Sequence, residues 1–272
     1  MNALAALLAT PVLPETASAQ QKAYVTYHHP PVIPSGDTAP SRPADRDSYD
    51  HITLLENRAI ISGSGTTGLR TWEAALHLGR FLCHNPAIVR GRRILELGAG
   101  TGYLSILCAA HLGTAHVIAS DGSDEVVSNL PDNLFLNGLR QLTPDEEDSR
   151  AVQVMDVKWG WALMGTEERE WNGGRPVDVV LAADVTYDRS VIPVLVVTLM
   201  DLFNQHPRAE LYIAATQRNR ETFEVFLDGC RRQGFGVEDI DFAIPSREEQ
   251  DGPFYSAEVE IKICKVTKSA DS

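Results

Sequence analysis

Alternating glycines are the first feature of this sequence that could support chemistry. Gly98, Gly100 and Gly102 follow a short apolar segment, Arg93–Leu97, and precede an apolar helical segment. A glycine loop between a strand and a helix exposes backbone N–H groups and lets a ligand approach the main chain closely. The dinucleotide fingerprint G-x-G-x-x-G needs a glycine where this chain has Tyr103, so the loop departs from that pattern.

Acidic side chains follow two further apolar segments. Asp121 comes directly after residues 116–120, and Asp184 comes directly after residues 177–183, with Tyr187 three positions later. An open α/β sheet binds ligands outside the carboxyl ends of its strands, so we expect these side chains at one site. Asp121 at this place suits the ribose hydroxyls of a nucleoside cofactor. The alternative interpretation is that Asp184 caps a helix and Tyr187 is simply packed.

Strands alternating with amphipathic helices must position these residues. From about Ile52 the spacing is typical of a doubly wound parallel sheet. Seven strands are predicted, at residues 93–97, 116–120, 152–157, 177–183, 211–215, 236–240 and 257–266. Helices are predicted at residues 71–83, 103–112, 124–137, 191–203 and 221–233. Thr71 is expected to cap the first helix, and Gly138 is expected to end the third.

Charge and composition exclude several classes of protein. The chain has 272 residues with 24 Lys+Arg against 37 Asp+Glu, a formal net charge of −13. This balance argues against binding to nucleic acid or to an anionic membrane. No run of about 18 apolar residues is present, so we expect no transmembrane helix. The four cysteines form no Cys-x-x-Cys pair, so we expect no metal site and a reducing, cytoplasmic location.

The N-terminal region differs in composition from the rest. Residues 1–50 contain seven of the fifteen prolines, which predicts a proline-rich, poorly ordered arm before one domain over residues 51–272. Ala17-Ser18-Ala19 is similar to a signal-peptidase site. However, no basic residue precedes Lys22, and prolines interrupt the apolar run, so we do not expect secretion.

Glu96, two residues before the glycine triplet, completes a pattern that resembles motif I of the seven-β-strand S-adenosylmethionine-dependent methyltransferases. With Asp121 and Asp184-Val185-Thr186-Tyr187, the set resembles the Asp-x-x-Tyr group of protein-lysine methyltransferases. Further segments resemble the eukaryotic elongation factor 2 lysine methyltransferase family: Ile60-Ile61-Ser62, Gly65 to Leu69, Thr71-Trp72, Ala74 to Leu76, Asn137 to Leu139, Ala182 to Val185, Arg218-Asn219 and Glu221-Thr222. The departure is the proline-rich arm, because relatives have a longer helical region there.

The resemblance implies a Rossmann-like, seven-stranded α/β sheet, mostly parallel with an antiparallel last strand, and helices on both faces. It implies S-adenosylmethionine as the cofactor, no metal, and N-methylation of a lysine in a folded protein, with elongation factor 2 as the leading target. We expect the enzyme to be a monomer. By resemblance the cofactor contacts are Trp72, Gly98, Ala99, Gly100, Gly102, Asp121, Trp159 and Ala183, with Asp156 near adenine. Asp184 would orient the amine and receive its proton, and Tyr187 would shape the channel.

Three alternatives stay open at this point. The same chemistry could serve another target, such as a chaperone or metabolic enzyme. The fold could bind its cofactor and act only through contact with a partner. A nicotinamide oxidoreductase is the third alternative, because Asp121 fits that class too. For the aromatic residues the alternative is packing: Trp72 on a helix face in the core, and Trp159 with Trp161 at a core edge.

Overall fold

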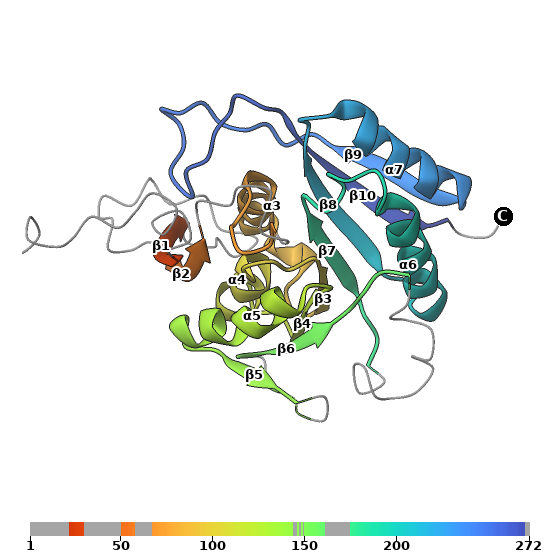
Figure 1. The fold of residues 1–272 in the computed structure, drawn as a ribbon. Coiled ribbons are helices and arrows are strands. Elements are labelled where there is room, and N and C mark those ends of the chain that lie inside the picture. The colour runs from red at the N-terminus through yellow and green to blue at the C-terminus, as the bar shows by residue number, and fades with distance from the viewer. Residues whose placement is uncertain are drawn as a thin grey trace, which may run out of the picture.

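A twisted sheet with helices on both faces makes up most of the computed structural model (Figure 1). The structure describes residues 22–29, 50–57, 67–143, 146, 148, 150–160 and 175–269. The strands are β1 Lys22–His29, β2 Asp50–Asn57, β3 Arg93–Leu97, β4 His116–Asp121, β5 Arg140–Leu142, β6 Ala151–Asp156, β7 Val179–Ala183, β8 Glu210–Thr216, β9 Phe235–Ile240 and β10 Ile261–Lys268. The helices are α3 Glu73–His84, η2 Pro86–Ile88 (a short 3-10 helix), α4 Tyr103–His111, α5 Asp124–Leu136, α6 Ile192–Gln205 and α7 Arg220–Arg232.

The large sheet confirms the predicted fold class. Its strand order is β5-β6-β4-β3-β7-β8-β10-β9, with neighbours parallel from β5 through β8 and β10 antiparallel to both β8 and β9. All seven predicted strands are present. The short edge strand β5 was not predicted, and β10 begins at Ile261 rather than residue 257.

Two apolar layers sandwich the sheet. Helices α3, α4 and α5 cover one face, and α6 and α7 cover the other (Figure 1). Side chains alternate along β3, so Ile94 packs beneath the first layer and Leu95 and Leu97 beneath the second. Glu96 therefore points toward the same layer as Ile94, and it is fully buried there. Among the described residues, no helix is long and apolar enough to cross a bilayer.

The N-terminal arm is only partly what its composition predicts. Lys22–His29 forms a strand, β1, that pairs antiparallel with β2 along its whole length. Tyr27 packs edge-on against Tyr103 with ring centroids 5.6 Å apart, and Lys22 Nζ donates to Asn129 at 2.7 Å. The expectation of a poorly ordered arm is thus wrong for Lys22–His29, because these residues gain a strand partner and a core to pack on. The rest of residues 1–50 lies outside the described part.

A chain of hydrogen bonds connects the hairpin of β1 and β2 to the glycine loop. The buried carboxyl group of Glu56 accepts from Tyr27 at 3.0 Å and from Thr71 at 2.5 Å. Thr71 Oγ1 also shares a hydrogen bond of 2.6 Å with Thr101, between the second and third loop glycines. Thr71 is therefore not the predicted helix cap; Trp72 occupies the N-cap position of α3 and makes no capping bond with its side chain.

Candidate active site

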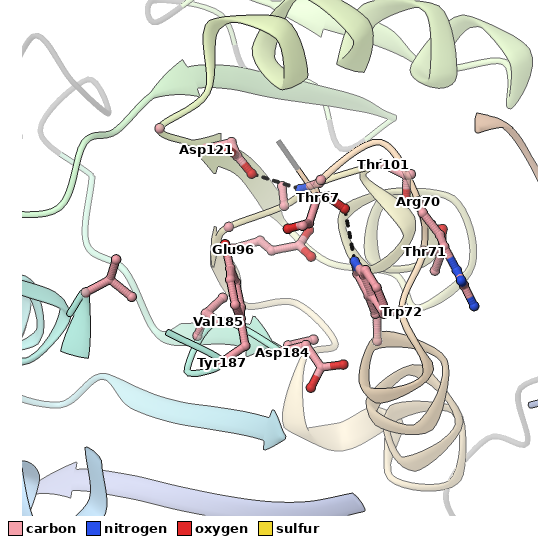
Figure 2. Close-up of a pocket in the computed structure, with 18 of the residues that line it drawn as sticks. Thr67, Arg70, Thr71, Trp72, Glu96, Thr101, Asp121, Asp184, Val185 and Tyr187 are labelled. Carbon is pink, nitrogen blue, oxygen red and sulfur yellow. Dashed lines mark hydrogen bonds between the residues drawn. The ribbon is translucent and has the colours of Figure 1, made fainter. Parts of the chain in front are cut away.

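A cavity of about 460 Å³ opens at the carboxyl ends of the parallel strands (Figure 2). Its walls come from the glycine loop after β3, the ends of β4, β6 and β7, the start of α3, and Arg218 after β8. Nine of the ten predicted site residues line it: Trp72, Gly98, Ala99, Gly100, Asp121, Trp159, Ala183, Asp184 and Tyr187. The exception is Gly102, the N-cap of α4, where a Cβ would lie 2.8 Å from Leu130 Cδ2. Gly102 therefore serves helix packing.

The glycine loop requires glycine for both conformation and space. Gly98 and Gly100 have φ values of +69° and +54°, which L side chains rarely adopt. A Cβ on Gly98 would lie 2.7 Å from Val185 Cγ1, and one on Gly100 would lie 3.0 Å from the carbonyl oxygen of Gly68. A side chain at either position would intrude on the cavity wall. The loop thus gives a ligand close access to the main chain.

The N–H groups of this loop are less available than predicted. The N–H of Ala99 donates to the Ser120 carbonyl oxygen at 2.9 Å, and that of Gly100 donates to Asp121 Oδ2 at 3.1 Å. Both groups hold the loop against β4 instead of facing a ligand. The loop therefore favours ligand binding because its glycines have no side chains, and not because these two N–H groups are free to donate.

Asp121 is fixed at the end of β4. Its Oδ1 accepts from the Ser123 N–H at 3.0 Å, while its Oδ2 holds Gly100. Burial raises the pKa of the Asp121 carboxyl, and the backbone hydrogen bonds oppose that rise. Asp121, predicted to bind ribose hydroxyls, is thus held in one orientation by two backbone hydrogen bonds.

Glu96 is a second carboxyl group on the cavity, and it is fully buried. Its Oε2 accepts from the N–H of Ser105 at 2.9 Å and from the Ser105 hydroxyl. Burial raises the pKa of Glu96 to about 8, against the lowering effect of the Ser105 hydrogen bonds. The nearby Asp121 carboxylate raises it further.

Glu96 is expected to make the cofactor-free protein less stable as the pH rises from about 5 to 8. The unfolded chain releases this proton near pH 4.5, whereas the folded chain keeps it until about pH 8. Over that window the folded state binds more protons, so the free energy of unfolding falls with pH and then levels off. Thermal melts at pH 5 to 9 should show that Glu96→Gln, which mimics the protonated group, lacks this part of the decline.

The matched control is Glu125→Gln, on the exposed surface of α5. It should keep the slope of the wild-type protein. Parallel melting curves for wild type and Glu96→Gln would contradict the raised pKa of Glu96.

Two arginines lie close to the Trp72 ring at the cavity wall. Its indole N–H donates to the Thr67 carbonyl oxygen at 3.0 Å (Figure 2). The guanidinium carbons of Arg70 and Arg218 lie 4.9 and 4.8 Å from the ring centroid. Glu73 binds both arginines, at 3.1 and 2.9 Å. Trp72 is thus a cavity residue held in place by cations rather than a core residue of the helix face.

Asp184 occupies a strained position at the end of β7. Its φ is +52°, unusual for a residue other than glycine. Its two carboxylate oxygens accept from the backbone N–H of Thr216 at 2.7 Å and from the Thr216 hydroxyl at 2.8 Å. Burial raises the pKa of Asp184, and the hydrogen bonds from Thr216 and the charge of Arg218 oppose that rise. The hydrogen bonds from Thr216, on the neighbouring strand β8, therefore stabilise the strained backbone conformation of Asp184.

The packing alternatives for the Asp-x-x-Tyr segment are wrong. Helix α6 begins at Ile192 with Val191 as its N-cap, so Asp184 caps no helix. The side chain of Tyr187 lies at the cavity and is 67% exposed, so it is not part of the core. Both residues line the cavity.

Some residues at or beside the cavity were not predicted, and a second predicted contact, besides Gly102, is absent. Arg218 lies just beyond β8 and lines the cavity, and Thr216, the last residue of β8, binds Asp184. The rule about carboxyl ends of strands would have found both. Asp156 does not line the cavity; it pairs with Lys158 at 3.1 Å. Trp159 does line it, whereas Trp161 and residues 60–66 lie outside the described part.

The chemistry of the cavity fits S-adenosylmethionine. Three carboxyl groups, from Glu96, Asp121 and Asp184, face a space that would receive a ligand with a cationic sulfonium and a protonated amine. Trp159 offers an aromatic wall beside Gly98 for a flat base. The glycine loop leaves room for a ligand against the main chain.

This sheet and this site define a Rossmann-like S-adenosylmethionine-dependent methyltransferase. A family model described as lysine methyltransferase matches residues 56–233. The chain belongs to this family, which makes it a protein-lysine methyltransferase and sets aside the oxidoreductase alternative.

Curated relatives agree with the family. The chain is 54% identical to protein-lysine N-methyltransferase EFM3 of Chaetomium thermophilum over 98% of its own length and 74% of the relative. It is 36% identical to human protein-lysine N-methyltransferase EEF2KMT over 79% of the chain and 64% of the relative. It is 32% identical to protein-lysine N-methyltransferase EFM3 of Saccharomyces cerevisiae over 67% of the chain and 54% of the relative. The chain thus spans between about half and three quarters of these relatives.

Proposed function

We propose that this protein transfers methyl groups from S-adenosylmethionine to a lysine of elongation factor 2 in the cytoplasm. The observation that carries the chemistry is the Asp184 carboxylate, fixed by Thr216 on the cavity that the glycine loop borders. The target is supported by the motifs shared with the elongation factor 2 lysine methyltransferase family and by the similarity to human EEF2KMT. The four cysteines are free and buried, which fits a reducing compartment.

When bound, S-adenosylmethionine supplies an electrophilic methyl group on its sulfonium. The residues that would hold it are Gly98 to Gly100 and Asp121, with Trp159 beside the base and Trp72 at the wall of the cavity. The lysine amine must be neutral to attack, yet at pH 7 a free lysine is neutral only about once in 2,500 molecules, a deficit of roughly 4.6 kcal/mol. The chain's own residues must therefore remove and accommodate a proton.

Asp184 is the group placed to do this. A carboxylate accepts a hydrogen bond from the amine and so aims its lone pair, and it can receive the proton that the amine gives up. Burial raises the pKa of Asp184, which makes it a better proton acceptor than an exposed aspartate. Arg218, which lines the same cavity, limits that rise. Apolar wall residues such as Val185 lower the pKa of an entering lysine by desolvation.

The test is methyl transfer from labelled S-adenosylmethionine to purified, unmodified elongation factor 2. A lysate from cells that lack the endogenous enzyme is run in parallel, with Asp184→Asn as the blank. Labelling of one lysine of the factor would support both chemistry and target. Labelling of another lysate protein alone, such as a chaperone or metabolic enzyme, would overturn the target. Cofactor binding with no labelling at all would favour a protein that acts only by contact with a partner.

A further inference from the structure

Three side chains able to bind a metal meet where the N-terminal hairpin joins the domain. His29 ends β1, Asp50 begins β2, and His111 ends α4. One ligand atom from each residue lies within 4.8 Å of the other two. None of the three lines the methyl-transfer cavity. We propose that this cluster binds a zinc ion, which fastens the hairpin to α4.

The backbone brings these residues together before any ion binds. His29 and Asp50 are directly opposite each other at one end of the antiparallel β1–β2 pair. The hairpin is seated on the helices by Ile52 and Leu54, which are fully buried in the same core as α4. A ligand set held by three ordered elements loses little conformational freedom on binding a metal.

The donor types and distances suit zinc. Zinc bonds of about 2.0–2.2 Å at tetrahedral angles place ligand atoms about 3.3–3.6 Å apart. His111 Nδ1 and Asp50 Oδ2 are 3.7 Å apart, and the rings of His29 and His111 have centroids 4.7 Å apart. Small side-chain rotations would bring the ligand atoms, now within 4.8 Å of one another, to the spacing that zinc requires. Two imidazoles and one carboxylate favour zinc over magnesium or calcium, which take mainly oxygen ligands.

The three ligands differ in their exposure to solvent, which indicates the route by which the ion would enter. His29 is fully buried, whereas the side chains of His111 and Asp50 are 18% and 47% exposed. The ion therefore has a route from solvent past Asp50, and a water molecule can complete the coordination. Because the three ligands converge only when β1 is paired and packed, binding should stabilise the folded hairpin.

The experiment uses the full chain purified without a polyhistidine tag, stripped of metal with a chelator and then freed of the chelator. Zinc chloride should bind at one ion per chain by mass-spectrometric metal analysis and should raise the melting temperature by about 3 °C or more at saturation. Magnesium and calcium should not. Cobalt(II) should give the intense visible absorption of a tetrahedral site.

Variants decide which residues hold the ion. Asp50→Asn and His111→Gln keep the size of the side chain, and each should weaken zinc binding by about tenfold or more. Zinc binding by His29→Gln is interpreted only if circular dichroism shows that this variant is folded, because His29 is fully buried. The matched control is the double variant His28→Gln/His51→Gln, an exposed pair on the same strands with ring centroids 6.0 Å apart.

Each outcome decides the proposal. Loss of one-to-one binding in Asp50→Asn and His111→Gln, with binding retained in the control pair, would support it. Loss in the control pair alone would overturn it in favour of surface histidines. Failure of the wild-type protein to bind one zinc, or an unchanged melting temperature at saturation, would also overturn it.

Discussion

Replacing Asp184 by asparagine is expected to reduce methyl transfer by about 10²–10⁴-fold and to change the affinity for S-adenosylhomocysteine by no more than a few-fold. Asparagine matches the size of aspartate and tolerates the positive φ at this position. It can still accept the N–H bond from Thr216. It cannot accept the amine's proton, so only the step that needs a base is lost.

The measurement pairs initial rates of labelling with calorimetric titration of S-adenosylhomocysteine. Asp178→Asn is the control, because Asp178 immediately precedes β7, at the end of the strand away from the cavity. Its carboxylate accepts a hydrogen bond from the backbone N–H of Arg93. This variant should retain near-normal rates. An Asp184→Asn enzyme with more than about a tenth of the wild-type rate would refute the role of Asp184 as base and orienting group.

Replacing Asp121 by asparagine is expected to have the opposite signature, weakening cofactor binding by about 10–100-fold. The lost interactions are charged hydrogen bonds, each of about 1.5–3 kcal/mol. Asparagine has one carbonyl oxygen, whereas Asp121 uses both carboxylate oxygens to hold Gly100 and Ser123. The glycine loop should therefore loosen as the cofactor contact weakens.

Calorimetric titration measures this affinity directly, and rates at saturating cofactor show whether the transfer step survives. Asp124→Asn is the control: it lies three residues further on, and its side chain is 86% exposed. Its cofactor affinity should equal that of the wild type. If Asp121→Asn binds as tightly as the control, the proposed contact with the cofactor is wrong.

The sheet and most of the site could be predicted from the sequence, because they depend on local residue patterns and on the order of the strands. The central strand β7 is wholly apolar, as a strand buried in a parallel sheet should be. The carboxyl ends of β4 and β7 place Asp121 and Asp184 on one cavity. The glycine loop was recognisable because its conformation and close packing leave few other residues possible. These features are set by neighbours in sequence or by the order of strands.

What could not be predicted depends on partners distant in sequence. The segment Lys22–His29 has no strong pattern of its own, and it becomes a strand only because β2 and Tyr103 are there to receive it. The carboxylate of Asp184 depends on Thr216, which lies on the next strand across the sheet. Thr71 looked like a helix cap because such residues favour that position, but a buried glutamate offers it a stronger partner.

The hydrogen-bonded chain from Tyr27 through Glu56 and Thr71 to Thr101 makes the hairpin and the cofactor loop one cooperative unit. Trimming the protein near residue 50, where the composition changes, would remove the Tyr27 hydroxyl from a buried carboxyl group. Amide hydrogen exchange in the glycine loop, about 50 residues beyond the cut, would then become faster. Strand β1, none of whose residues lines the cavity, would thereby influence how firmly the cavity holds its shape.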